Sequence, residues 1–304
     1  MRDGAENAPR DELQVALICT VFNEERSIAR FIDSVNGQTV LPDEMVVVDG
    51  GSDDRTCQLI EDRLDKRVRL NLIIDSTCNR RFVSGPIARG RNCAIRSASF
   101  EHILVTDAGC VLDRDWVRRL KGRLAEGADV VSGCYRPQPG TRFQNLVGSI
   151  FCPAVEYKHA KDFLPSSRSI AFTRRIWREV GGYPEDTYTG EDTKFDLLLF
   201  AKTERVVIES AAIVFWEMPE DLSALFRKVY QYGVGDGGQA HAGGRYLLRA
   251  LCVLFPPLYV LLVLTGRRKA FGYVIYLAQV LGYLRGVAGR RFGWRSRAVV
   301  RGNS

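Results

Sequence analysis

Two acidic positions are the parts of this chain best suited to chemistry. Asp107 follows directly on the apolar run 103–106, as it would in a buried parallel strand that brings a carboxylate to the edge where open α/β sheets bind ligands. Glu191 and Asp192 follow Gly190 and precede an apolar segment, as carboxylates at the start of a packed helix would. The pattern predicts a site in which one acid holds a metal-bound nucleotide and another accepts a proton.

Repeated strand, loop and helix units are predicted to position these acids. The apolar run 15–19 precedes a loop at 20–23 and then a helix with apolar residues at 28, 31, 32 and 35, the spacing of one helical face. A second strand, 45–48, ends at the turn 49–52, and the alternation continues to about residue 131. Such alternation is typical of an α/β fold with a mainly parallel sheet.

The chain divides into four predicted segments. Residues 1–12 are expected to be a flexible N-terminus, and residues 13–218 one catalytic domain, with a regular half over 13–131 and a loop-rich half over 132–218. An amphipathic helix and a glycine-rich loop are predicted for 219–245, and a basic, hydrophobic membrane-associated segment for 246–304.

Charge separates the last segment from the rest. Asp236 is the last acidic residue, and 11 of the 43 basic residues follow it, so that the net charge is −4 up to residue 236 and +11 beyond. Two uncharged apolar stretches, 250–266 and 270–284, are each shorter than the roughly 20 residues of a spanning helix. Because the basic triplet 267–269 separates them, we expect an interfacial or re-entrant hairpin on anionic lipid. The eight scattered cysteines, with no Cys-x-x-Cys pair, favour a reducing cytoplasm.

Several motifs occur in an order that resembles family 2 glycosyltransferases of the GT-A fold, over roughly residues 13–235. They are Thr20-Val21-Phe22-Asn23-Glu24, Val48-Asp49-Gly50-Gly51-Ser52, Ala88-Arg89-Gly90-Arg91-Asn92, Thr106-Asp107-Ala108-Gly109, Gly181-Gly182-Tyr183-Pro184 and Gly190-Glu191-Asp192. Each is weak alone, and the ordered set is specific. The stretches 167–172, 190–193 and 232–236 are similar to bacterial enzymes of extracellular polysaccharide assembly, including the succinoglycan type.

The resemblance implies an inverting glycosyltransferase that moves a sugar from a nucleoside diphosphate, such as UDP, to a lipid-linked or growing glycan. Its place would be the cytoplasmic face of the bacterial inner membrane. The donor-binding residues it implies are Thr20, Phe22, Glu24, Asp49, Arg89, Arg91 and Asp107. Asp192 would be the general base and Glu191 would position the acceptor or the loop. Tyr183 and Trp216 would line an acceptor groove, with core packing as an equal alternative.

The metal site departs from the family pattern. Asp107 is expected to bind Mn²⁺ or Mg²⁺ together with the donor diphosphate, since these cations prefer carboxylate and phosphate oxygens. Gly109 stands where the family's D-x-D motif has its second acid. Waters, phosphates and a histidine, His159 or His241, would complete the coordination, although a surface or packing role is the alternative for either histidine.

Two other classes of protein stay open. A membrane scaffold that kept the fold but lost catalysis would explain Gly109, and a nucleic-acid-binding protein would explain the basic tail. The tail interleaves its arginines with long apolar runs, so no nucleic-acid partner is expected. The run 233–238 matches G-x-G-x-x-G but follows a helical pattern and not a strand, so a dinucleotide site is not expected.

Overall fold

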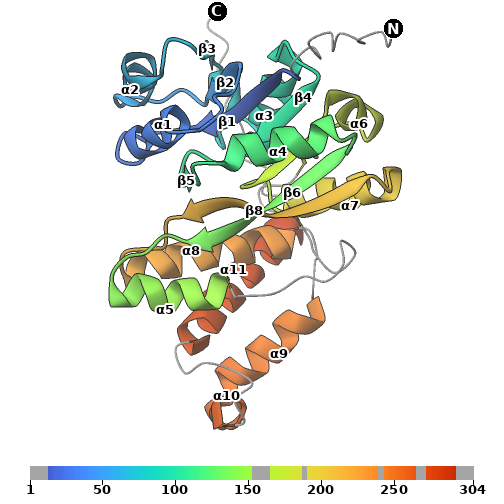
Figure 1. Cartoon of the computed structure of the whole chain (residues 1–304). Coiled ribbons are helices and arrows are strands. Elements are labelled where there is room, and N and C mark those ends of the chain that lie inside the picture. Colours follow the sequence, from blue (N-terminus) through green and yellow to red (C-terminus); the bar gives the residue numbers. More distant parts are fainter. Residues whose placement is uncertain (1–12, 153–164, 187–189, 239–242, 265–271, 292–304) are drawn as a thin grey trace, which may run out of the picture.

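Within the described residues, one eight-stranded sheet organises the upper part of the molecule (Figure 1). The structure is a computed structural model of the whole chain and describes residues 13–152, 165–186, 190–238, 243–264 and 272–291. The predicted flexible N-terminus, the basic triplet 267–269, His159 and His241 lie outside the described residues.

The strands lie in the order β3-β2-β1-β4-β7-β6-β8-β5. Their bounds are Val15–Val21 (β1), Glu44–Asp49 (β2), Arg69–Ile74 (β3), His102–Val105 (β4), Cys110–Leu112 (β5), Val130–Pro137 (β6), Ile170–Thr173 (β7) and Val206–Trp216 (β8). Strands β1 and β2 are almost entirely buried, which explains their nearly continuous apolar runs.

Helices cover both faces of this sheet and form a separate group below it (Figure 1). Those of the sheet region are Ile28–Asn36 (α1), Thr56–Arg63 (α2), Pro86–Ser97 (α3), Trp116–Ala125 (α4), Arg174–Glu179 (α6) and Glu191–Lys202 (α7). Those of the lower region are Arg142–Phe151 (α5), Leu222–Gly238 (α8), Gly243–Leu254 (α9), Pro256–Leu264 (α10) and Gly272–Arg291 (α11).

The predicted α/β class is confirmed, and the sheet is mixed but mainly parallel: of the strands in the described residues, β6 and β8 run in the same direction as the first four, and β7 and β5 run against them. Strands β3, β2, β1 and β4 are mutually parallel, whereas β7 runs antiparallel to both β4 and β6. Strand β5 is antiparallel to β8. Four-residue strands such as β7 are buried on both faces, and a continuous apolar run carries no information on strand direction.

Two apolar cores lie on the two faces of the sheet. One packs α1, α2 and α4 against β1, β2 and β8, with Phe31 and Trp116 fully buried. The other packs α3, α6 and α7 against the opposite face, with Phe172 and Phe195 at its centre. The parallel strands are thereby covered on both sides, and their carboxyl ends stay free to form a site.

The predicted glycine-rich loop within 219–245 is helical as far as Gly238, the last residue described before the gap at 239–242. Helix α8 packs along α11, and glycines on each helix meet backbone of the other: a Cβ at Gly233 would lie 2.3 Å from the Gln279 carbonyl oxygen. A Cβ at Gly282 would lie 2.1 Å from that of Tyr230. The match to G-x-G-x-x-G therefore reflects close helix packing.

The structure divides the predicted segment 246–304 into two parts. Helix α11 belongs to the folded body, because Ile275 and Ala278 are buried in a third core with Leu225 and Val229 of α8. Helices α9 and α10 form the lower end of the molecule in Figure 1. In the described part of the chain no single helix is long and apolar enough to cross a membrane; α9 and α10 reach that length together, but the chain bends by 104° between them.

Candidate active site

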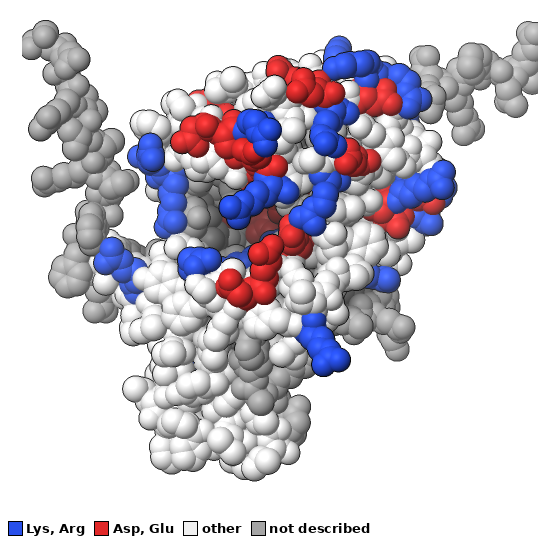
Figure 2. All heavy atoms as spheres, turned by 90° about the vertical axis from the view of Figure 1, so that its left-hand side faces the viewer, with Lys and Arg blue, Asp and Glu red and all other residues white. Residues whose placement is uncertain are grey.

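A cavity of about 1430 Å³ opens where the carboxyl ends of β1, β2 and β4 meet the end of β8 and the start of α8. Its walls include residues 20–27, Asp107 to Gly109, residues 216–221 and Lys228. Figure 2 shows a hollow with acidic and basic side chains gathered around it. The volume exceeds the roughly 300–1,000 Å³ of an ordinary ligand pocket, so the cavity has room for a large ligand or two.

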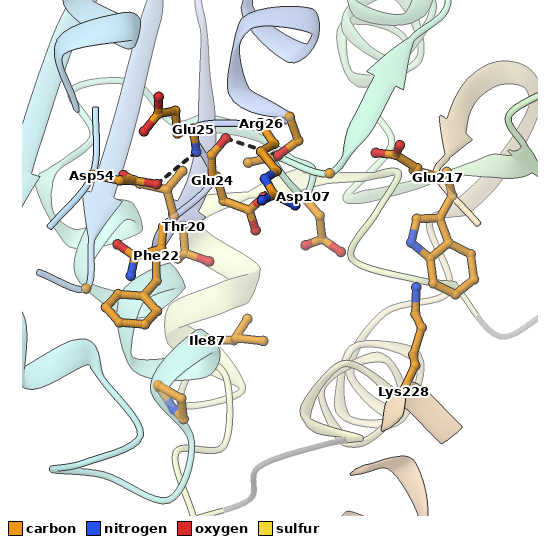
Figure 3. A pocket seen from close by; sticks show the side chains of 18 of the residues that line it. Thr20, Phe22, Glu24, Glu25, Arg26, Asp54, Ile87, Asp107, Glu217 and Lys228 are labelled. Atoms are coloured by element: carbon orange, nitrogen blue, oxygen red, sulfur yellow. Dashed lines mark hydrogen bonds between the residues drawn. The ribbon is translucent and has the colours of Figure 1, made fainter. Parts of the chain in front are cut away.

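Three of the predicted donor-binding residues, Thr20, Phe22 and Glu24, line one side of this cavity. The Phe22 ring is 47% exposed and free to stack on a planar ligand, and Figure 3 shows it across the cavity from Lys228. Gly90 of α3 allows the close approach that shapes this wall, because a Cβ there would lie 2.7 Å from Thr20 Cγ2. Burial raises the pKa of Glu24 above its ordinary value.

Asp49 does not line the cavity, contrary to the prediction of direct donor contact. Its side chain is buried, and the carboxylate accepts hydrogen bonds from the backbone N–H groups of Gly51 and Ser52, at 3.0 and 2.8 Å, and from the Ser52 hydroxyl. Gly51 has a φ of 86°, which the turn requires. Asp49 therefore holds the loop whose Gly50 forms part of the cavity wall.

Arg91 also differs from its predicted role, because it lies beneath the site and joins two acids. Its guanidinium is 4% exposed and donates to Asp107 Oδ1 at 2.8 Å and to Glu191 Oε1 at 3.1 Å. Although burial opposes it, the surrounding carboxylates, led by Asp107, raise the pKa of Arg91. Arg89 does not line the cavity either, and its charge acts on Asp75.

The acidic pair at the start of α7 lies on the far side of Arg91. Glu191 is buried, and burial raises its pKa, an effect that Arg91 partly offsets. Asp192 is half-buried, and its charge acts on both Arg91 and Arg168 although it does not line the large cavity. Its role as the base stays a prediction.

One helical turn beyond Asp192 stands a carboxyl that the sequence analysis did not single out. Asp196 is fully buried, and neither of its oxygens has a hydrogen-bond partner among the described residues. Burial, with the nearby charge of Asp192, raises the pKa of Asp196 well above its ordinary value. Its burial without a hydrogen-bond partner thus favours the uncharged form of this carboxyl.

The two aromatic residues predicted for an acceptor groove have different environments. Tyr183 is 2% exposed, stacks on Phe195 with ring centres 3.9 Å apart and shares a hydrogen bond with Ser167. Its ring is core, so direct contact with an acceptor is corrected to a supporting position under Arg91, whose guanidinium lies 5.3 Å from the ring centre. Trp216 lines the cavity, and its contact with an acceptor stays a prediction.

Sequence reasoning missed two cations at this site. Arg168 lies in the loop before β7, with its Nε 3.8 Å from Asp107 Oδ2. Lys228, on α8, lines the cavity, and Figure 3 shows its amino group directed toward the wall below Glu217. The amphipathic pattern of 219–245 did not single out Lys228, because a helical pattern does not reveal which neighbouring element will cover the polar face of the helix.

Asp107 is the predicted ligand for a divalent cation. Asp107 is 35% exposed and already forms ion pairs with Arg91 and Arg168. No group of three acidic, histidine or cysteine side chains suited to a metal occurs in the described part of the chain. A Cβ at Gly109 would meet nothing within 4 Å, so the position of the family's second acid is open space on the cavity wall. Asp107 with substrate phosphates could still hold Mg²⁺ or Mn²⁺.

Comparison with solved structures defines the class of fold. A mannosyltransferase from Pyrobaculum calidifontis, solved with GDP-mannose and Mn²⁺, superposes with a TM-score of 0.62 at 17% identity, covering 94% of this chain and 89% of its own. Residues 1–349 of TarS from S. aureus, solved with UDP, give a TM-score of 0.52 at 17% identity, with 93% of each chain covered. These likenesses establish a GT-A-like fold.

Comparison of the sequence itself identifies the family. The profile of "Glycosyl transferase family 2" matches residues 16–179, more than half of the chain. The chain is 22% identical over 224 residues to the uncharacterised glycosyltransferase EpsJ of Bacillus subtilis, covering 69% of this chain and 63% of that protein. It is 24% identical over 204 residues to the O-antigen chain rhamnosyltransferase RfbN of Salmonella typhimurium, covering 59% of each.

The chain therefore belongs to glycosyl transferase family 2, and the family predicted from its motifs is confirmed. It spans about three fifths of the length of these two curated relatives.

Proposed function

We propose that this protein is an inverting glycosyltransferase that moves a sugar from a nucleoside diphosphate to a growing or lipid-linked glycan. One observation carries the proposal: a strand-end carboxylate, Asp107, faces a cavity beside an exposed aromatic ring, Phe22, and is joined through Arg91 to a second acidic pair. In this arrangement Phe22 and Asp107 form the donor side, and Asp192, beyond Arg91, is the acid that can accept a proton. A UDP-linked donor is our choice, since one structural neighbour is solved with UDP.

In the proposed reaction the base of the nucleotide stacks on Phe22, and the diphosphate lies near Asp107. An acceptor hydroxyl attacks the anomeric carbon as Asp192 takes its proton, and the bond to the diphosphate oxygen breaks on the opposite side, which inverts the anomeric centre. Arg91 keeps Glu191 and Asp107 at fixed separation, so little reorganisation is needed when charge moves. A divalent cation at Asp107, when bound, would neutralise charge on the departing diphosphate.

The proposal includes attachment to the cytoplasmic face of a membrane. Helices α9 and α10 carry large apolar side chains in solvent, with Leu254 81% and Leu264 79% exposed. Figure 2 shows that the lower part of the molecule is nearly free of charged side chains on that face. An exposed apolar surface of this kind, on a chain whose tail is basic, supports contact with anionic lipid.

A hydrolysis screen tests the proposed activity. Purified full-length protein is incubated with a panel of UDP-, GDP- and dTDP-sugars, with and without Mn²⁺, and nucleotide release is measured. We expect slow release from one or a few UDP-sugars, accelerated by a matching acceptor. Release from none, together with no nucleotide binding, would instead favour the inactive scaffold that Gly109 suggests.

A further inference from the structure

Two cations converge on one tryptophan at the cavity wall. The guanidinium carbon of Arg168 lies 4.0 Å from the centre of the Trp216 ring, and Lys228 Nζ lies 3.9 Å from the same ring. Edge contacts from Tyr135 and Phe151, with ring centres 6.1 and 6.3 Å away, hold the indole in place. Three separate elements, β8, α8 and the loop before β7, are needed to build this arrangement.

The positive charge of this cluster is incompletely matched. Arg168 Nε is buried, donates no hydrogen bond to a described residue and has its nearest carboxylate at 3.8 Å. That carboxylate, Asp107, is already hydrogen-bonded to Arg91 at 2.8 Å. Lys228 has no ion pair in the described part of the chain, and an indole face contributes only about 0.5–2 kcal/mol to a nearby cation.

The surroundings of Lys228 favour the binding of an anion next to it. Burial, and then repulsion from Arg168, lowers the pKa of Lys228 to about 8. The other groups that act on it are Asp107 and two cysteines, Cys110 and Cys152. Burial raises the pKa of these thiols to about 12 and about 11, so both stay neutral where Lys228 titrates.

The residues that share the cavity with this cluster indicate which ligand it could bind. Lys228 and Asp107 line the same cavity as Phe22, and Figure 3 shows the Asp107 carboxylate between the Phe22 side and the Lys228 side. A nucleotide stacked on Phe22 would extend its phosphates toward this point. At Gly109 a second metal-binding acid is missing, so part of the diphosphate charge needs another partner.

We propose that Lys228 binds the donor diphosphate directly, and that Arg168 positions Trp216 and adds positive potential. Together they replace the positive charge of the cation that a second acid would otherwise help to hold. This rests on the proposed function and assigns a phosphate-binding group to it. Lys228 acts as a compact point charge, which suits a phosphate oxygen.

Nucleotide binding by the full-length protein tests the proposal, with UDP and GDP as probes in isothermal calorimetry, in EDTA and in Mn²⁺. We expect wild-type binding to persist in EDTA. Lys228→Met, which keeps the apolar stem, should weaken it by at least about tenfold, the loss of a charge-assisted hydrogen bond. Lys202→Met is the matched control, because Lys202 at the end of α7 does not line the cavity and pairs with Glu179, and it should change affinity by less than about threefold.

Two further measurements keep the test decisive if Lys228→Met folds poorly. An anion favours protonated Lys228, so wild-type affinity should fall as pH rises above about 8, with proton uptake on binding in that range. Gly109→Asp, which enters open space, should make binding more dependent on Mn²⁺. Binding that requires Mn²⁺ in the wild type, and that Lys228→Met leaves unchanged, would overturn this proposal alone. Absence of binding by the wild type would overturn the proposed function with it.

Discussion

Arg91 is the side chain on which the relative placement of the acids depends. It bonds Asp107, 16 residues away, and Glu191, 100 residues away, from a position with 4% exposure. Loss of one partner from a buried ion cluster leaves an uncompensated charge and costs several kcal/mol. Arg91 therefore links the edge of the sheet to the start of α7 and holds the two sides of the site together.

The first prediction at the residue scale separates binding from proton transfer. Asp192→Asn keeps the shape of the side chain but cannot accept a proton, so the transfer rate should fall by roughly 10²–10⁴-fold while UDP binding persists. Initial rates with an identified donor and acceptor, compared with calorimetric UDP affinity, provide the measurement. Near-normal turnover would point to Glu191 as the base, and Glu191→Gln should then lose activity.

The second concerns the buried carboxyl of Asp196. Its folded-state pKa is raised above the unfolded value, so its contribution to stability is greatest at low pH and is lost as pH rises from the unfolded pKa through the folded one. Asp196→Asn cannot ionise, so its stability relative to wild type should increase between pH 4.5 and pH 8. Urea unfolding midpoints at both pH values measure this.

Asp186→Asn serves as the control for that comparison, because the Asp186 side chain is 74% exposed and should show no such trend. An equal effect of Asp196→Asn at both pH values would mean that Asp196 finds a compensating partner.

At the scale of elements, the α8–α11 contact joins the cavity to the lower part of the molecule. Lys228 lies on α8, and the same helix presents Gly233 and Gly237 to the backbone of α11. Removal of residues 246–304 would therefore take away α11 and uncover the core that contains Leu225 and Val229. A protein truncated at residue 245 is therefore not expected to remain folded in this region.

Gly282→Ala should separate these two helices. A Cβ there would lie 2.1 Å from the Tyr230 carbonyl oxygen, so we expect a loss of about 1–3 kcal/mol of unfolding free energy and weaker UDP binding. Gly289→Ala, on the same helix with nothing within 4 Å, should be neutral or stabilising by about 0.5–1 kcal/mol. Denaturant unfolding of both variants measures the contrast, and equal effects would contradict a close helix contact.

At the scale of the whole molecule, the charged cavity lies at one end and an exposed apolar surface at the other. The cavity and its charged rim occupy the sheet region, and exposed leucines occupy α9 and α10. This polarity suits an enzyme that takes a soluble donor and acts next to lipid, with α8 and α11 between the two regions (Figure 1).

Vesicle flotation tests the membrane proposal. The double variant Leu254→Glu, Leu264→Glu should reduce binding to phosphatidylglycerol-containing vesicles by at least about tenfold, because each buried leucine contributes about 1.5–3 kcal/mol. Leu197→Glu, which alters a leucine that is 57% exposed on α7, should leave binding unchanged. Equal flotation of all three proteins would show that α9 and α10 do not contact lipid.

Local pattern was sufficient for the class of fold and for part of the site. Apolar runs, helical spacing at 28–35 and an aspartate after a buried strand depend on near neighbours in the chain, and they predicted the α/β units. The ordered motifs predicted the family by resemblance, and the structure places Phe22 and Asp107 on the wall of one cavity. The sequence shows these features directly because apolar runs and periodicity appear within short stretches of the chain.

Tertiary structure alone decided which distant residues meet. The antiparallel insertion of β7, the bridge from Arg91 to Glu191, the burial of Tyr183 and the convergence of Arg168 and Lys228 on Trp216 each join segments far apart in sequence. A residue's type shows that it can be buried or charged, but the choice of partner depends on how the sheet and the helices pack, because that packing sets the distances over which ion pairs and ring contacts act.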